Sequence, residues 1–233
     1  MVFAVIFEVE PKASHFNTYL AMAQALRPQL EQMAGFEAIT RYASLRRRGW
    51  ILSLSDWASE KALVRWRTVA GHHAAQEKGR DAVLNEYHLR VGEVAADSTW
   101  AAEDVLPQQR LDETEVGAGK AALLVDGRLD EEWLKGREDK PEDVAAKLGI
   151  EVSKALELGA LEWDAFEAVL SPGDVIFLGT WKDMQALEEF EKKLDGIEGV
   201  RRRRVRIVRD YGMFDRREAP QYYPDVIGKE TKH

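Results

Sequence analysis

The 233-residue chain contains no cysteine. This excludes structural disulfides, thiolate catalysis and thiolate metal ligands. No apolar run reaches the ~18 residues that a membrane-spanning helix needs. The apolar segment 2–9 lacks the preceding cationic stretch of a signal peptide. A formal net charge of −8 argues against nucleic-acid binding, which needs a cationic surface. We therefore expect a cytoplasmic globular protein that binds neither nucleic acid nor membrane.

What the chain does have is an internal repeat. Ile51-Leu-Ser-Leu-Ser-Asp-Trp57 returns as Val175-Ile-Phe-Leu-Gly-Thr-Trp181, an offset of 124 residues. The same offset separates Trp66 from Phe190, the aromatic residues of the amphipathic segments that follow. An apolar strand that ends in Trp and runs into a helix therefore occurs in both halves.

The first half has the order β-α-β-β-α-β. Ser14 is the expected N-cap of the first helix, Gly35 its stop, and Gly71 an interruption of the second helix. The predicted strands are 2–9, 36–45, 50–57 and 87–94, and the predicted helices are 14–33, 59–69 and a further piece over 73–84.

The second half repeats this order less regularly. Ser171-Pro-Gly-Asp174 is a strong turn signal between two of its strands, and Pro141 suits a helix start. The predicted strands are 121–125, 161–170, 175–181 and 200–211, the predicted helices are 141–158 and 184–194, and 126–140 is a polar surface excursion.

These patterns predict an α+β fold made of two tandem ferredoxin-like (βαββαβ) units. Each antiparallel sheet carries helices on one face only, so we expect the two sheets to pack face to face as a pseudo-dimeric α+β barrel. The expected divisions are 1–100 with the active site, a linker over 101–119, a degenerate unit over 120–214, and an extended tail over 215–233. Two such units create two pseudo-equivalent pockets, and we expect only the first to be functional.

The halves differ by an insertion. Between the fourth strands the offset falls to 113, which leaves about eleven extra residues before the fourth strand of the first half. They lie over 71–80 and carry His72, His73, Gln76 and Arg80. Insertions over a scaffold commonly hold functional residues.

Five short motifs of the first half occur together in one known family. They are Trp50-Ile-Leu-Ser-Leu-Ser-Asp-Trp57, Trp66-Arg67, His72-His-Ala-Ala-Gln76, Gly79-Arg80 and Tyr87-His-Leu-Arg-Val91. With them, residues 2–95 resemble the antibiotic biosynthesis monooxygenase family of dimeric α+β-barrel proteins. The segment Val208–Arg216 with Ala219-Pro220 resembles the tail that follows the last strand of single-domain relatives.

The resemblance implies a cofactor-independent monooxygenase. Its substrate, an electron-rich aromatic or quinol-type small molecule, supplies the electrons for dioxygen, while protein groups deprotonate and position it. In this interpretation Trp66 walls the pocket, His72 is the base or oxyanion partner, and Arg80 and Tyr87 orient the substrate.

Each of these residues also has a purely structural interpretation. Trp66 lies on the apolar face of its helix and is typical of core packing. His73 stands at i+7 from Trp66, so spacing alone leaves open which of the two histidines faces the pocket. Arg80 could instead pair with a neighbouring acid, and Tyr87 is a common strand residue. Further candidates for substrate binding are Gln76, His73, Trp50, Arg41 and His15.

Two other clusters carry less chemistry. Adjacent histidines point in different directions, so a metal site is not expected. The basic run Arg201–Arg204 is predicted to pair with acids on a neighbouring strand or on the Glu-rich helix over 188–191.

Two alternative functions stay open. The first is haem binding or degradation, known in sister proteins of this fold. Two features differ from those proteins: the first strand has no Asn, and the histidines come six and seven residues after Trp66, a different spacing. The second is a small-molecule-binding module without turnover. A homodimer is a further expectation.

Overall fold

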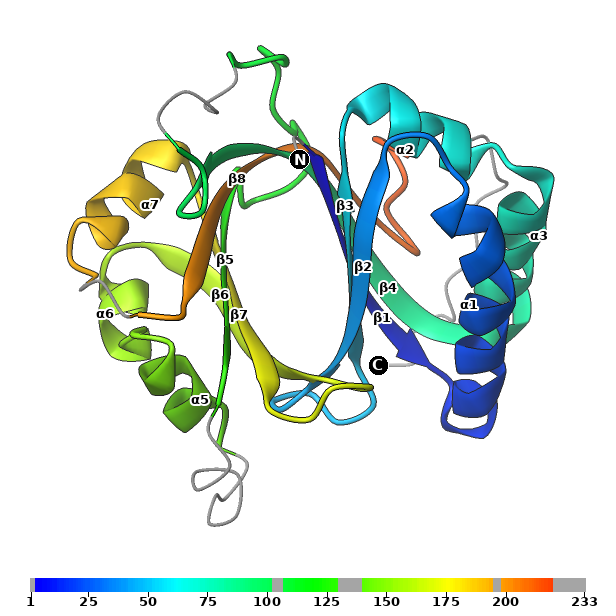
Figure 1. Cartoon of the computed structure of the whole chain (residues 1–233), viewed down its shortest axis with the longest axis horizontal. Coiled ribbons are helices and arrows are strands. Elements are labelled where there is room, and N and C mark those ends of the chain that lie inside the picture. The colour runs from blue at the N-terminus through cyan, green and yellow to red at the C-terminus, as the bar shows by residue number, and fades with distance from the viewer. Residues whose placement is uncertain (1–2, 102–106, 130–139, 195–197, 220–233) are drawn as a thin grey trace, which may run out of the picture.

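The computed structural model describes residues 3–101, 107–129, 140–194 and 198–219. It forms one closed eight-stranded barrel, in which the strands follow the order β1-β3-β2-β6-β7-β5-β8-β4. The helices of each half lie outside the barrel, on opposite sides of the molecule (Figure 1). The predicted α+β fold of two tandem ferredoxin-like units is confirmed.

The first half covers residues 3–97 and carries the longer helices. Its elements are β1 (Phe3–Pro11), the short 3₁₀ helix η1 (Ala13–His15), α1 (Phe16–Glu31), β2 (Phe36–Ser44), β3 (Ile51–Trp57), α2 (Glu60–Arg67), α3 (Ala70–Lys78), the π-helical turn η2 (Gly79–Val83) and β4 (Leu84–Asp97).

The second half covers residues 121–212 and repeats the plan with shorter helices. Its elements are β5 (Ala121–Arg128), α5 (Pro141–Lys147), α6 (Val152–Glu157), β6 (Ala160–Ala168), β7 (Asp174–Trp181), α7 (Met184–Glu191) and β8 (Arg201–Gly212). The predicted excursion over 126–140 lies mostly outside the described residues.

The repeat detected in the sequence is a structural equivalence. Trp57 and Trp181 end β3 and β7 and are fully buried. The next helix is capped in the same way in both halves, because Ser59 accepts a hydrogen bond from the Ala62 amide and Asp183 accepts one from the Ala186 amide.

Two antiparallel pairings join the halves. β4 pairs with β8 along most of its length, and β2 pairs with β6 through residues 42–44. Side chains alternate between the faces of each strand. In β1, Ala4 and Ile6 therefore point into the barrel, while Val5 and Phe7 face the helices.

Four local predictions were wrong. Gly71 does not interrupt the second helix: α2 already ends at Arg67, and Gly71 lies inside α3. The piece predicted over 73–84 starts at Ala70 instead and passes through η2 into β4.

The other two concern helix ends. Ser14 is not the N-cap of α1, because η1 precedes that helix and the Ser14 hydroxyl bonds the His15 ring. The helix predicted over 141–158 is divided into α5 and α6 at Gly149, whose φ of +80° suits glycine.

The basic run on β8 is part of the barrel, as predicted. Arg201 pairs with Asp97, and Arg203 is buried between Asp56 and Asp126. Arg204 pairs with the acids of α7. Arg201, Arg203 and Arg204 therefore form structural ion pairs.

Candidate active site

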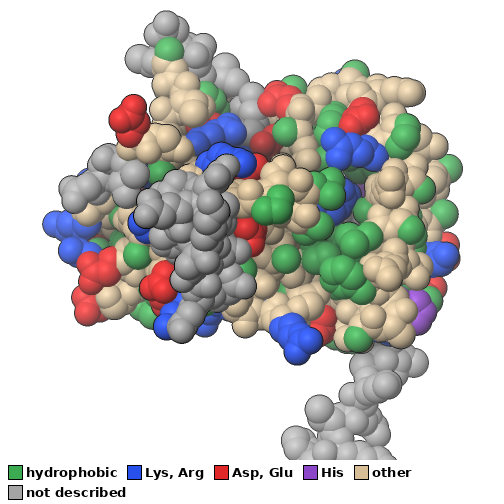
Figure 2. Space-filling view, turned by 60° about the horizontal axis from the view of Figure 1, so that its bottom comes forward, with side chains coloured by type: hydrophobic (Ala, Val, Ile, Leu, Met, Phe, Trp, Pro, Cys, Tyr) green, Lys and Arg blue, Asp and Glu red, His purple; other side chains and the backbone are tan. Residues whose placement is uncertain are grey.

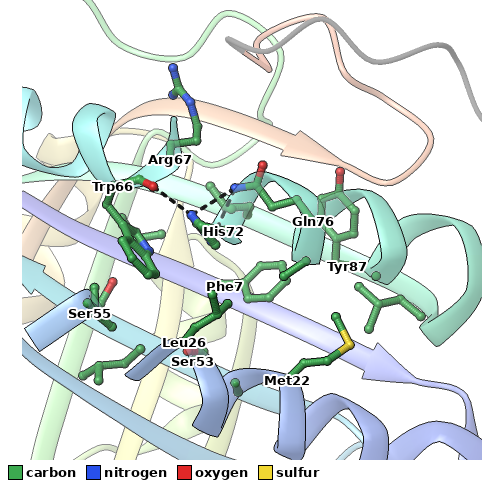
Figure 3. A pocket seen from close by; sticks show the side chains of 18 of the residues that line it. Phe7, Met22, Leu26, Ser53, Ser55, Trp66, Arg67, His72, Gln76 and Tyr87 are labelled. Atoms are coloured by element: carbon green, nitrogen blue, oxygen red, sulfur yellow. Dashed lines mark hydrogen bonds between the residues drawn. The ribbon is translucent and has the colours of Figure 1, made fainter. Parts of the chain in front are cut away.

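A cavity of about 230 Å³ lies between the sheet of the first half and its helices. Its walls are mostly apolar. Figure 3 shows Trp66, His72 and Gln76 on one side, and Met22, Leu26 and Ser53 across from them. In Figure 2, hydrophobic side chains also gather on the surface of this half of the molecule. An apolar cavity with a few convergent polar groups is the usual form of a small-molecule site.

The strand register explains why the sheet of the first half leaves room for this cavity beneath its helices. Ser53 on β3 pairs with Arg41 on β2. At the equivalent place in the second half, Phe177 on β7 pairs with Ala165 on β6. Phe177 is completely buried and stacks on Trp163 with their ring centroids 6.1 Å apart. The space that Ser53 leaves open is therefore filled by an aromatic ring in the other half.

Trp66 and His72 form the centre of the site. Their rings stack with centroids 4.5 Å apart and planes 16° apart. His72 Nδ1 lies 3.1 Å from the Trp66 carbonyl oxygen. A carbonyl only accepts hydrogen bonds, so Nδ1 carries the proton and Nε2 is the acceptor, with the Gln76 amide nitrogen 3.4 Å away. The interruption of the helix between α2 and α3 allows this geometry, because α3 turns back against the end of α2.

Burial keeps His72 uncharged. Loss of hydration, reinforced by the charges of Arg67 and His73 and opposed by the bond to Trp66, lowers the pKa of His72 to about 4. The imidazole is therefore neutral at pH 7. Its Nε2 can accept a hydrogen bond or a proton from a bound hydroxyl.

A second polar group lies at the β4 side of the cavity. The Tyr87 hydroxyl accepts a hydrogen bond from Arg216, which comes from the segment after β8. Burial raises the pKa of Tyr87, while the charges of Arg216 and Arg80 oppose this rise. Arg80 is itself buried in η2. The phenol is thus kept protonated at neutral pH.

The predicted site residues divide clearly. Six of them line the cavity: Trp66, His72, Gln76, Arg80, Tyr87 and Arg41. Trp66 is also core, because it is only 8% exposed and packs with its neighbours on α2 and β1. Gln76 Nε2 lies 3.4 Å from His72 Nε2, so it can orient the base.

The other three candidates are not among the residues that line the cavity. His73 is exposed, because the new start of α3 at Ala70 shifts the helical register that favoured it. Trp50 precedes β3 and stacks under the Arg47 guanidinium, 4.4 Å away. His15 belongs to η1, where its ring bonds Ser14.

The cavity is also lined by residues outside the predicted set, among them Tyr19, Ser53, Ser55, Tyr211 and Arg216. A signal existed for two of them. Position-by-position comparison of the repeats would have found Ser53 opposite Phe177, and Arg216 lies in the segment that resembles the tail of single-domain relatives.

The described part of the chain contains neither a cluster of metal ligands nor a helix that could span a membrane. Within that part, no three His, Asp or Glu side chains are grouped as a metal site. Among the same residues, each helix is too short or too polar to cross a bilayer.

The fold defines an α+β-barrel protein, and its described residues enclose a largely apolar cavity in the first half. The model of the antibiotic biosynthesis monooxygenase family matches residues 2–78. A curated relative from Pyricularia oryzae (strain 70-15), named jasmonate monooxygenase ABM, is 48% identical over 227 residues, which cover 96% of this chain and 99% of the relative. The chain therefore belongs to the antibiotic biosynthesis monooxygenase family and is an enzyme of the monooxygenase type.

A solved structure with a TM-score above 0.5 has a similar fold. An aldoxime dehydratase in complex with butyraldoxime has a TM-score of 0.53 at 10% identity, and the match covers 88% of this chain and 79% of that one. A second aldoxime dehydratase structure gives a TM-score of 0.48 at 12% identity, with 88% and 81% covered.

Proposed function

We propose that the protein is a cofactor-independent monooxygenase acting on an electron-rich aromatic or quinol-type small molecule bound in the first-half cavity. The observation that carries the proposal is the neutral His72, stacked on Trp66 in an apolar cavity with Nε2 as an acceptor. Such a group suits removal of a proton from an acidic substrate hydroxyl.

The chemistry balances without an added reductant. His72 Nε2 takes the hydroxyl proton. Burial destabilises the resulting imidazolium, and the Trp66 carbonyl and the Trp66 ring face offset only part of this cost. The electron-rich anion then reduces dioxygen. Where a methylene is oxidised to a carbonyl, R₂CH₂ + O₂ gives R₂C=O + H₂O, so one oxygen atom enters the product and the substrate supplies all four electrons.

The remaining polar groups position the substrate. Gln76 lies beside His72 and holds the imidazole or the developing anion. Tyr87, fixed by Arg216, offers a hydrogen bond at the β4 side. Arg80 supplies positive charge next to it.

A second candidate substrate is a jasmonate-type acid, because the curated relative is named for jasmonate and covers nearly the whole chain. Hydroxylation of a saturated C–H bond has a different balance. RH + O₂ + 2e⁻ + 2H⁺ gives ROH + H₂O, so this reaction requires an external two-electron donor such as a reduced nicotinamide.

Oxygen uptake separates these possibilities. The wild-type protein and His72→Asn are mixed with a panel of dihydroxyaromatics, and with jasmonic acid in the presence and absence of reduced nicotinamide. Uptake with a dihydroxyaromatic alone, lost in His72→Asn, supports the proposal. Uptake only with jasmonic acid and the reductant favours the second candidate.

Two controls address the alternatives. Ligand binding with no oxygen uptake under any condition identifies a binding module without turnover. A Soret shift on addition of haemin, abolished in His72→Asn, identifies haem binding and contradicts the absence of a cofactor.

A further inference from the structure

The charge of the cavity wall is one-sided. Four arginines line it, Arg41, Arg67, Arg80 and Arg216, and none of the described lining residues is Asp or Glu. A cationic, largely apolar pocket favours an organic anion, because a buried positive charge is costly unless a negative charge accompanies it.

The arginines are not equivalent. Arg216 is bound to the Tyr87 hydroxyl, and the Arg67 side chain points away from Trp66 in Figure 3. Arg41 lies near Tyr19, where its charge opposes the rise in the Tyr19 pKa that burial causes. The Nε atom of Arg41 is buried without a hydrogen-bond partner among the described residues. The Nε atoms of Arg67 and Arg80 are buried in the same way, but those two residues make other interactions. An unsatisfied buried donor of this kind is unfavourable unless a ligand completes it.

The repeat provides an internal comparison for Arg41. Its equivalent in the filled second half is Ala165, which is completely buried in core. The guanidinium is therefore not needed to build this sheet. It occurs together with Ser53, in the half that keeps the cavity.

The position of Arg41 also sets the direction in which a bound molecule would lie across the sheet. It lies on β2, in the same row as Ser53 on β3, Phe7 on β1 and Leu89 on β4. Three strand spacings of ~4.8 Å place it about 14 Å across the sheet from β4, where the Tyr87 group begins. A molecule held at Arg41 would therefore extend over Ser53 and Phe7 toward the opposite polar end.

Building on the proposed function, we propose that Arg41, supported by Tyr19, binds the carboxylate of the substrate. The substrate class is a small carboxylic acid with an apolar body. The planar guanidinium matches a carboxylate, and Nε with one terminal nitrogen forms the usual bidentate pair.

The test measures binding and not turnover. Calorimetry compares carboxylic acids with their methyl esters, with jasmonic acid and 4-hydroxyphenylacetic acid as the probes. The variants are Arg41→Met, Arg41→Lys and Tyr19→Phe. Arg48→Met, a substitution of an exposed turn residue, is the matched control.

We expect at least one acid to bind the wild-type protein about 10- to 100-fold more tightly than its ester. This preference falls to about one in Arg41→Met, is intermediate in Arg41→Lys, and persists in Arg48→Met. If Arg41→Met does not fold, as judged by circular dichroism, Arg41→Lys and Tyr19→Phe must each lower the preference.

The proposal is overturned if no acid binds more tightly than its ester, or if the preference survives in all Arg41 and Tyr19 variants. It is also overturned if Arg80→Met or Arg216→Met removes the preference while Arg41→Met retains it. If the wild-type protein prefers the acid and Arg41→Met does not, but no oxygen uptake is found with any substrate, the carboxylate site stands and the proposed oxygenase chemistry is rejected.

Discussion

Exchanging one residue between the two halves should separate function from stability. Ser53 lines the cavity, and its equivalent Phe177 fills the matching space of the second half. We predict that Ser53→Phe closes the cavity with little cost to folding. The reciprocal change, Phe177→Ser, should open a void where no binding residues surround it.

The magnitudes follow from burial. A fully buried Phe contributes about 1.5–3 kcal/mol, while overpacking costs about 1–3 kcal/mol. Ser53→Phe should thus change the unfolding free energy by less than about 2 kcal/mol. The Tm then shifts by no more than about 8 °C, given ~2–4 °C per kcal/mol at this chain length. In contrast, Phe177→Ser should lose about 3–5 kcal/mol, as large-to-small changes of buried aromatics do.

The activities should move in the opposite way. Ser53→Phe should lower kcat/KM at least about 100-fold, equivalent to ~2.7 kcal/mol of transition-state binding. Phe177→Ser should retain wild-type kcat/KM in its folded fraction. Oxygen uptake, with calorimetry for binding and urea unfolding for stability, measures all three quantities. Full activity in Ser53→Phe, or lost activity in a folded Phe177→Ser, would refute the assignment of the cavity.

Three further predictions concern charge. Because burial lowers the pKa of His72 to about 4, the acid limb of kcat/KM should lie near pH 4. The unfolded imidazole titrates near 6.5, so stability should fall by about 1–3 kcal/mol as the pH drops from 6.5 to 4; an acid limb near 6.5 would contradict a buried base. Glu8→Gln should cost about 3–5 kcal/mol in urea unfolding, because it removes the carboxylate that binds the buried Arg90 at 2.5 Å. A loss below about 1 kcal/mol would show that Arg90 is held by its other partners. Glu218 accepts hydrogen bonds from the backbone amides of residues 115, 116 and 210, and so holds the segment that carries Arg216. Glu218→Ala should lower kcat/KM about tenfold and cost about 1–3 kcal/mol of stability through the lost hydrogen bonds. An unchanged kcat/KM in the folded variant would exclude this positioning role.

Much of the fold is predictable because it depends on periodicity. Alternating apolar residues and the repeated Trp mark the strands of both halves, and glycine and proline mark their turns. The pairing of β2 with β6 is different, because it rests on three residue pairs between segments more than a hundred residues apart. No local pattern specifies it. Its consequence is that the closed barrel leaves no free strand edge among the described elements, so a homodimer, which stays a prediction, would have to form through helices or loops.

The site is predictable only in part, since its key geometry depends on a helix boundary. Both histidines were visible, but helical spacing from Trp66 favoured His73. α2 ends at Arg67, and α3 restarts at Ala70. This change of register brings His72 onto the Trp66 ring and leaves His73 exposed. The position of this helix boundary therefore decides which of the two imidazoles lines the cavity.

The repeat offers information that composition and spacing do not. The strands of the two halves align at an offset of 124 residues. Where a position is polar in one half and apolar in the other, a packing role common to both halves does not explain the polar residue. Arg41 opposite Ala165 and Ser53 opposite Phe177 are such positions, and they are neighbours in one strand register. Arg41 and Ser53 give the first half less apolar packing at these two positions than the second half has, and this lowers the stability of its core. That cost is understandable if the cavity binds a ligand, and this is why the reciprocal exchange of Ser53 and Phe177 tests the function of the protein more directly than removal of any one polar group.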